Sequence, residues 1–574
     1  MIRKGRRLVL ALFVLIGPFQ FALGLRTLPI PGCFSRGLAI AETDQREPPA
    51  VLPRLDGTWL AWTEKSTTGP RILFTTVNAE GRASTPQPLD LPLASASQPL
   101  LLELAGTPWL LVAGRESPEA SRRVFGIPLG GMGEPSGVPV PLTPREVPDI
   151  RSYTAAVTSV GLWIAYVDRT DDVWLSLFRP DTEEVARWRL GKGPDRPAMA
   201  AEGEVIHVVL RLGETSSVYA LAYVQADETG PSSPFVIDQV PLGIGSVPSP
   251  PALFLSRGRL YAAVGLEHRG GELAGTAEVM VSVFPRDEPS QVTSYTLSLP
   301  GVFPQEHPYN WEGLSLAPLP PQDEVRPTDL YQPRGVPGAR ELGLLMVGAK
   351  LYSRGQGEVQ PVLVAFRDGV PIAWAPIAKT RTFSYFTELR TSPRGWHAAW
   401  TDMLGYGEYR IFYASTAESE RTALNRLGWD DAVYFLGTIA TGLVGGLALI
   451  PLFLMAGVPG LALLFLHYAV GGEESLRYRW PKVLLVLGLL PYLVLKLALA
   501  GAFGGVPFAQ WMSQATAHAA AKALPFIPSL LGLAAMWIYW RKAGEPNLLP
   551  AWGTFVVADV VFTVLLLGPA FAGG

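Results

Sequence analysis

With 574 residues, the chain is too long for one hydrophobic core, so two or more domains are predicted. Its only cysteine, Cys33, excludes an intramolecular disulfide and a cysteine-based metal cluster. The net charge of −3 hides an acidic middle: six basic residues lie in 1–41, and seven basic and six acidic ones in 430–574, which leaves 34 basic and 44 acidic side chains in 42–429. Such a segment gains nothing from counterion release on a phosphate backbone, which argues against nucleic acid as a partner.

Residues 1–41 are predicted to be a signal peptide or a signal anchor. A basic start is followed by an apolar run from Leu8 to Leu25, which is the pattern of a secretory signal. Ala22-Leu23-Gly24 and Ala39-Ile40-Ala41 are two candidate cleavage sites, and Ile30-Pro31-Gly32-Cys33 faintly resembles a lipoprotein box. With cleavage, anchoring or lipidation alike, the basic residues stay inside and the following domain is exported.

Between residues 45 and 420, a Gly-containing turn leads repeatedly into two short strands with alternating aromatic and β-branched residues. Paired strands of this kind, separated by Gly and Pro turns, are hairpins. Clear copies begin at Gly57, Gly161, Gly203, Gly258 and Gly395, and weaker ones near Gly106 and Leu342. Repeats of about 40–50 residues or slightly more are typical of propeller blades. We predict an all-β propeller of seven blades, with six blades or an open β-sandwich array as alternatives.

One hairpin resembles a known family. Its residues are Ala399-Trp400-Thr401-Asp402 and then Tyr409-Arg410-Ile411-Phe412-Tyr413-Ala414, and Leu60-Ala61-Trp62-Thr63 repeats the first half. These units resemble blades of sialidase-like (Asp-box type) β-propellers, and the resemblance implies a propeller fold and glycoside hydrolysis. The Asp-box turn of that family, Ser-x-Asp-x-Gly-x-Thr-Trp, is missing, because Asp56-Gly57-Thr58-Trp59 shares its letters but not its spacing. This departure counts against the hydrolase activity.

The proline-rich stretch from Pro300 to Gly338 interrupts the strand pattern. It contains the candidate ligand-binding residues His307, Tyr309, Trp311 and Glu312, because long loops on rigid scaffolds often carry function. The alternative is an insertion that caps one face of the propeller.

Signatures of catalysis are weak. No histidine has a second ligand at metal-site spacing, so neither a metal nor a cofactor is predicted. His207 and His397 lie in predicted strands, where we expect packing. Carboxylates at Asp171-Asp172 could in principle do acid–base work on a glycosidic bond, but predicted turns favour solvated acids. We therefore favour a protein that is not an enzyme.

Residues 430–574 are predicted to form an all-α, multi-pass transmembrane domain. Residues 432–470 contain no Asp, Glu, Lys or Arg, and 483–503, 524–540 and 551–571 are each long enough for one span. If Arg477, Arg479 and Lys482, and then Arg541 and Lys542, face the cytoplasm, residues 432–470 cross once, with a broken or re-entrant piece after Pro459. That gives four spans. Two crossings of the first block would give five.

Two charges lie inside these apolar blocks, Lys496 and Asp559. A buried intramembrane charge is costly and tends to face protein or water. We predict a Lys496–Asp559 pair that holds the bundle together. The alternatives are a member of a proton or ion path, or a snorkelling lysine with a protonated aspartate.

The sequence thus predicts a multi-pass protein of the plasma membrane, with the lipid bilayer as partner and an extracytoplasmic propeller that binds a ligand or protein without catalysis. A membrane-anchored sialidase-like hydrolase acting on glycans is one alternative. A subunit of a larger membrane complex is another, because four spans exceed what anchoring needs.

Overall fold

The computed structural model describes residues 30–499, 523 and 526–572, apart from residues 68, 145, 181, 183, 214–217, 305, 326–327, 338–340, 354–355, 381 and 448. The chain divides into two compact units: Pro29–Tyr352 with Gly357–Arg426, and a helical unit that includes Leu427–Gly574. Each unit is described by itself below. The apolar run of the predicted leader lies outside the described residues.

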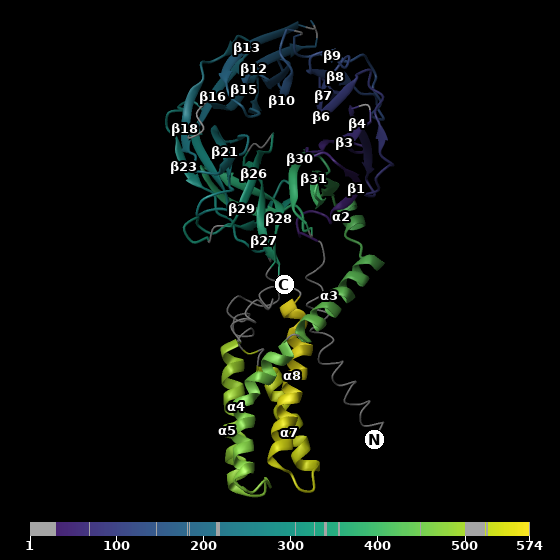
Figure 1. Ribbon diagram of the computed structural model, residues 1–574. Coiled ribbons are helices and arrows are strands. Elements are labelled where there is room, and N and C mark those ends of the chain that lie inside the picture. The colour runs from purple at the N-terminus through teal and green to yellow at the C-terminus, as the bar shows by residue number, and fades with distance from the viewer. Residues whose placement is uncertain are drawn as a thin grey trace. The chain divides into compact units, whose positions relative to one another are not determined.

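The first unit is a seven-bladed β-propeller, in which seven antiparallel sheets are arranged in a ring (Figure 1). Blade 1 contains β2 (Ala50–Pro53), β3 (Gly57–Ser66), β4 (Gly69–Asn78) and β5 (Gln87–Pro88). Blade 2 contains β6 (Ser95–Leu104), β7 (Thr107–Arg115), β8 (Arg123–Pro128) and β9 (Val140–Pro141). Blade 3 contains β10 (Ile150–Val157), β11 (Leu162–Asp168), β12 (Asp172–Arg179) and β13 (Glu184–Lys192).

The remaining blades carry additional strands. Blade 4 contains β14 (Ala198–Glu202), β15 (Val205–Leu212), β16 (Val218–Asp227), β17 (Gly230–Pro231) and β18 (Phe235–Pro241). Blade 5 contains β19 (Ser246–Pro248), β20 (Ala252–Ser256), β21 (Arg259–His268), β22 (Ala277–Pro285) and β23 (Thr293–Thr296). Blade 6 contains β24 (Tyr309–Trp311), β25 (Leu314–Pro318), β26 (Leu330–Gly335), β27 (Gly343–Ser353), β28 (Gln356–Arg367) and β29 (Val370–Pro376). Blade 7 contains β30 (Ser384–Ser392), β31 (Gly395–Gly405), β32 (Glu408–Ser415) and β1 (Leu38–Thr43).

The seven predicted repeats correspond to the seven blades, so the six-bladed alternative is wrong. Each repeat begins at or next to the second strand of its blade, as at Gly57 for β3 and Gly395 for β31. Seven clusters of buried apolar side chains hold the ring together, one between each pair of neighbouring blades. This arrangement follows from the alternation of aromatic and β-branched residues, because a blade buries its two faces only against its neighbours.

The amino-terminal strand closes the ring. β1 pairs antiparallel with β32, from Leu38 opposite Tyr413 to Thr43 opposite Tyr409. Ahead of β1, the Ser35 amide donates to the Ser415 carbonyl at 2.8 Å. The propeller therefore begins before residue 45, and the candidate cleavage site Ala39-Ile40-Ala41 lies within its closing strand. Cleavage there would remove most of this strand and leave blade 7 without its outer edge.

Cys33 belongs to the propeller core rather than to a lipoprotein box. It is buried among side chains of blades 6 and 7, and the Ser315 amide donates to its Sγ at 3.2 Å. Burial raises the pKa of the Cys33 thiol to about 11. A sulfur in this position is not available to carry a lipid while the propeller is folded.

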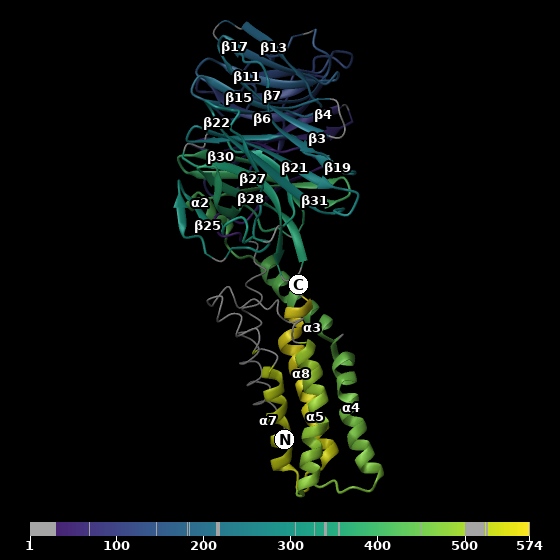
Figure 2. The same cartoon turned by 90° about the vertical axis from the view of Figure 1, so that its left-hand side faces the viewer.

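The helical unit contains α3 (Trp429–Leu447), α4 (Leu449–Ala469), α5 (Arg479–Leu499), α7 (Phe526–Lys542) and α8 (Leu548–Ala572) (Figures 1 and 2). A short helix, α2 (Glu418–Leu424), follows the last propeller strand. Within the unit, α4 packs along α5, and both α3 and α7 pack along α8. In the described residues, two apolar stretches, Leu443–Ala469 and Leu548–Leu566, meet the length and composition that a membrane crossing requires.

The predicted break after Pro459 is wrong, because α4 continues through this residue to Ala469. The continuous helix α4 also packs closely against α5. A Cβ atom on Gly460 would lie 1.9 Å from the Gly488 carbonyl oxygen, so glycine at 460 is what lets the two backbones approach so closely.

The two connections of the helical hairpins are joined to each other. Leu476 donates its amide to the Pro546 carbonyl at 2.9 Å, and Leu548 donates to the Glu474 carbonyl at 3.0 Å. The basic residues next to these connections, at 477–482 and 541–542, therefore share one end of the helical unit.

Candidate functional site

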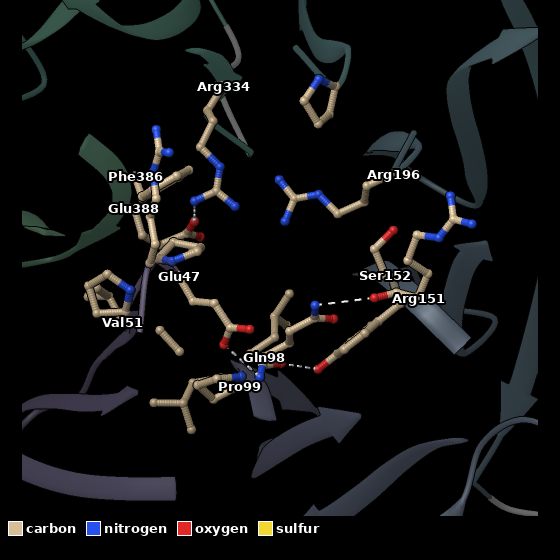
Figure 3. A pocket seen from close by; sticks show the side chains of 18 of the residues that line it. Glu47, Val51, Gln98, Pro99, Arg151, Ser152, Arg196, Arg334, Phe386 and Glu388 are labelled. Atoms are coloured by element: carbon tan, nitrogen blue, oxygen red, sulfur yellow. Dashed lines mark hydrogen bonds and ion pairs between the residues drawn. The ribbon is translucent and has the colours of Figure 1, made fainter. Parts of the chain in front are cut away.

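A polar chamber of about 420 Å³ lies where the inner strands of the propeller converge (Figure 3). All seven blades contribute to it. The lining residues used below are Arg46, Glu47, Gln98, Arg151, Tyr153, Asp195, Arg196, Arg334, Phe386, Glu388 and Arg390. Its volume lies within the range of about 300–1,000 Å³ that small-molecule sites occupy. A chamber to which every blade contributes is a property of the closed ring rather than of one hairpin.

Proline and strand irregularities open the inner strands toward the chamber. Pro49, Pro99 and Pro333 lie at or just before the inner strands of blades 1, 2 and 6. Proline fits the innermost strand because its missing N–H leaves no ladder bond unmade at a free edge. Pairing shifts register around Gln98 in β6 and around Phe386 in β30, and both residues have positive φ, at 54° and 48°. Bulges of this kind re-aim side chains next to functional sites.

The chamber is positively charged although its domain is acidic. Five arginines line it against the three carboxylates of Glu47, Asp195 and Glu388. Two further charged partners stand just behind the lining: Asp171, 2.7 Å from Arg151, and Arg211, 3.3 Å from Asp195. Because these two partners cancel each other, the excess of two positive charges is unchanged.

Most of these charges have protein partners. Glu388 Oε2 accepts a hydrogen bond from Arg334 Nη1 at 3.1 Å, and its Oε1 lies 2.7 Å from Arg390 Nη2. Glu47 Oε2 accepts from the Thr63 hydroxyl at 2.6 Å and from the Gln98 amide at 3.1 Å. The Arg46 guanidinium lies over the Phe386 ring, 5.4 Å from its centroid. The chamber thus contains two separate groups of polar contacts, one around Glu388 and one around Glu47.

Arg196 differs from the other chamber arginines. It makes no hydrogen bond or ion pair to any residue that the structure describes, and Figure 3 shows its guanidinium pointing into the chamber from the side opposite Glu388. Its depth in the protein, and then the neighbouring positive charge of Arg334, lower the pKa of Arg196 to about 9. Near neutral pH it remains a cation, and it faces the same space as Arg334, whose own partner is Glu388.

Two further groups in the chamber, Asp195 and Tyr153, are of the types that can take acid–base and nucleophilic roles. Burial raises the pKa of Asp195 above its ordinary value, although Arg211 acts in the opposite direction. Tyr153 is buried and donates its hydroxyl to the Gln98 carbonyl at 2.6 Å. Because this hydrogen bond goes to a backbone carbonyl, it does not activate the phenol as a nucleophile, which requires an adjacent base.

The four ligand-binding candidates of the proline-rich stretch lie away from this chamber. Tyr309 and Trp311 are the ends of β24, which pairs with β25 at the far edge of blade 6 from its inner strand β26. Trp311 packs against Trp396 with centroids 6.0 Å apart, and Trp396 Nε1 donates to the Glu312 carbonyl at 2.8 Å. His307 packs against Gly32. These contacts describe a covering hairpin, and ligand binding by it stays a prediction.

The two histidines expected to pack in strands are buried. His207 Nδ1 lies 2.8 Å from the Tyr223 hydroxyl. His397 Nδ1 lies 2.7 Å from the Tyr413 hydroxyl and 3.0 Å from that of Thr58, which joins blade 7 to blade 1. Among the described residues, no group of three His, Cys, Asp or Glu side chains is arranged as a metal site would be.

A second polar cluster lies in the helical unit, around Lys496. Lys496 Nζ is 2.7 Å from Asp559 Oδ1 and 2.8 Å from its Oδ2. It also donates to the hydroxyls of Ser529 and Thr563, both at 3.1 Å, while the Tyr492 hydroxyl donates to Asp559 Oδ2. All five side chains are buried, and they come from α5, α7 and α8. The cluster is therefore a satisfied network between three helices.

Comparison with known proteins gives a fold-level likeness only. No protein-family model and no curated protein matches the chain. Among solved structures, the polysaccharide lyase Uly1 is 9% identical, with a TM-score of 0.40 over 66% of this chain and 90% of the lyase. The β-propeller domain of the Trilobed protease from Pyrococcus furiosus is 11% identical, with a TM-score of 0.36 over 65% of this chain and 97% of that domain. A thermostable family-43 glycoside hydrolase is 10% identical, with a TM-score of 0.29 over 46% of this chain and 95% of the hydrolase.

Proposed function

We propose that this protein is a membrane-embedded binding protein whose extracytoplasmic propeller takes an anionic ligand in its axial chamber. The observation that carries the proposal is Arg196, a cation without a partner among the described residues, which faces Arg334 across the chamber. A charge that is partly removed from water and lacks a protein partner is costly. An anion bound between the two guanidinium groups would remove that cost, and arginine is suited to hold carboxylate or phosphate through paired hydrogen bonds.

The membrane part of the proposal is supported by the helical unit. Large apolar side chains are exposed on α3, α4 and α5, among them Leu436, Val444, Met455, Val486 and Leu490. Lys496 and Asp559, the two charges in the middle of its apolar helices, are paired inside it. Apolar side chains outside and paired charges inside are what a bilayer requires. With the basic end of the unit in the cytoplasm, α3 and α4 together cross once, and the propeller faces outward.

The number of helices also favours partners in the membrane. One span is effectively irreversible as an anchor, so the additional helices are available to bind other membrane proteins. We propose that the helical unit serves in such an assembly while the propeller presents the binding chamber. Purification in a mild detergent, with identification of the chains that copurify, tests this part; a monodisperse monomer from native membranes would contradict it.

The binding function is tested by anion-dependent stabilisation of the full chain in detergent. A ligand that binds only the folded state raises the unfolding temperature, so sodium sulfate should raise it more than sodium chloride at equal ionic strength. Arg196→Gln should abolish this difference. Arg269→Gln is the matched control, because Arg269 does not line the chamber, is 63% exposed and pairs with Glu267. If sulfate stabilises all three proteins equally, its effect is general and the chamber is not its site.

Glycoside hydrolysis is a second candidate, favoured by one observation. The chamber contains two carboxyl groups in contrasting environments: burial raises the pKa of Asp195, whereas Glu388 is held between two arginines. A carboxyl group with a raised pKa, together with a second carboxyl group in the same site, is the combination that glycosidases use. The purified protein should then release nitrophenol from at least one member of a panel of 4-nitrophenyl glycosides. Asp195→Asn and Glu388→Gln should each abolish that release, and activity retained in both variants would refute this candidate.

A further inference from the structure

The carboxylate of Glu388 already occupies the place that an anionic ligand would take on two of the chamber arginines. Its two oxygens are shared between Arg334 Nη1, at 3.1 Å, and Arg390 Nη2, at 2.7 Å. All three side chains are partly exposed to the chamber, at 17%, 20% and 25%. The pair is therefore accessible from the chamber rather than sealed in the core, and water or a ligand can reach it.

The backbone just before Glu388 is irregular. β30 changes register against β31 between Tyr385 and Glu388, and the intervening Phe386 has a φ of 48°. The register shift falls just before Glu388, which is itself paired with Ala399 in a regular run that continues to Ser392. Displacement of Glu388 from its arginines would therefore be a movement of its side chain rather than of the strand.

The charges of the chamber indicate which kind of ligand would replace Glu388. The chamber has two positive charges in excess while Glu388 neutralises part of Arg334 and Arg390. A ligand with one negative charge would leave one cation uncompensated. A ligand with two would neutralise the chamber, provided that Glu388 stays within it while one group of the ligand meets Arg196 and the other lies against the arginines that Glu388 now holds.

We infer that the ligand is a dianion, such as a dicarboxylate or a phosphate monoester, and that Glu388 is an internal counter-anion that the ligand displaces from Arg334 and Arg390. This inference rests on the proposed binding function and adds the charge of the ligand and the role of Glu388. In the absence of ligand, Glu388 keeps the two guanidinium groups aimed and prevents their repulsion from opening the chamber. Any ligand must compete with Glu388 for these arginines. A singly charged anion therefore binds poorly, because it offers no more charge than the carboxylate that it displaces.

Succinate and succinamate test the charge of the ligand, because they share a carbon frame and differ by one negative charge. Calorimetric titration of the full chain in detergent, at fixed ionic strength, should show succinate binding at least about tenfold more tightly, the value of one charge-assisted hydrogen bond. Inorganic phosphate, in the same titration, distinguishes a phosphate ligand from a dicarboxylate. Equal binding of succinate and succinamate, with both lost in Arg196→Gln, would refute the dianion while leaving the anion-binding function in place.

Glu388→Gln tests the counter-anion with an effect of defined sign. If Glu388 competes with the ligand, the substitution raises the affinity for succinate several-fold. It also reduces the ratio of the affinities for succinate and succinamate, because the freed arginines accept either anion. If Glu388 only positions Arg334, the same substitution lowers affinity, which would overturn the inference. Unfolding temperatures without ligand verify that the variant is folded, and Glu388→Asp, which keeps the charge, should restore the weaker binding. Binding of none of these anions, in wild type or variant, would refute the proposed function itself.

Discussion

Removal of Asp559 alone should destabilise the helical unit far more than removal of Asp559 and Lys496 together. In the single variant Asp559→Leu, the ammonium of Lys496 loses two contacts of 2.7 and 2.8 Å and keeps only the hydroxyls of Ser529 and Thr563. The Lys496 side chain is 2% exposed, so water does not replace what is lost. Breaking a buried pair on one side costs about 3–5 kcal/mol.

The double variant Lys496→Met with Asp559→Leu removes both charges and should cost less. What remains is the Tyr492 hydroxyl without its acceptor, at about 1–3 kcal/mol. Adding Tyr492→Phe should recover that amount, because it removes the hydroxyl that has lost its acceptor. Thr563 is unaffected, since it donates to the Asp559 backbone carbonyl at 2.7 Å, which any residue at 559 preserves. The measurement is unfolding in mixed detergent micelles, with Lys482→Met as a control that removes an exposed lysine. A double variant as unstable as the single ones would refute pairing as the role of these charges and favour an ion path.

Three further predictions concern the propeller. If a leader is removed, mass spectrometry of the purified protein should find its first residue upstream of Cys33; a chain that begins after Ala41 yet retains a folded propeller would contradict closure by β1. Cys33 should not react with maleimide until the protein is unfolded, because it is buried and its pKa is about 11; rapid labelling of folded protein would contradict this placement. Burial lowers the pKa of His397 to about 3, so the folded state binds its proton less readily than the unfolded state does. The stability advantage of wild type over His397→Gln should therefore shrink below pH 6.5, by up to about 1.4 kcal/mol per pH unit, as measured by denaturant titration at several pH values.

The blades could be predicted from the sequence because each carries its own local signal. A Gly turn followed by alternating large residues, as at Gly57 and Gly395, fixes a hairpin without reference to the rest of the chain. The closing strand could not be found in this way. Leu38–Thr43 lies next to an apolar leader, and only its pairing with β32, almost four hundred residues away, identifies it as part of the propeller.

The chamber was missed for a related reason. Arg196, Arg334 and Glu388 belong to three blades, and no spacing within the sequence brings them together. A signal did exist, since prolines recur at or before the inner strands, as in Gln98-Pro99, Arg196-Pro197 and Gln332-Pro333. These prolines mark the strand that faces the axis, so the polar residues beside them could have been collected as one site. The predicted ligand-binding residues lay in the proline-rich stretch instead, although its aromatic residues pack at the edge of blade 6.

The Lys496–Asp559 contact shows the opposite case, in which sequence alone was informative. Two charges in otherwise apolar helices have few possible partners, and their depths matched to within the reach of a lysine side chain. What the sequence did not indicate is that Tyr492, Ser529 and Thr563 complete the network, because hydroxyl groups are ordinary in such helices.

The central claim is that Arg196 holds an anion in the axial chamber. The most direct measurement is calorimetric titration of sulfate into the full chain in detergent, with wild type, Arg196→Gln and Arg269→Gln compared at constant ionic strength. The account predicts saturable, one-site binding in wild type and Arg269→Gln, and a dissociation constant at least about tenfold higher in Arg196→Gln, because one charge-assisted contact is worth that factor. Identical titration curves for Arg196→Gln and wild type would contradict it.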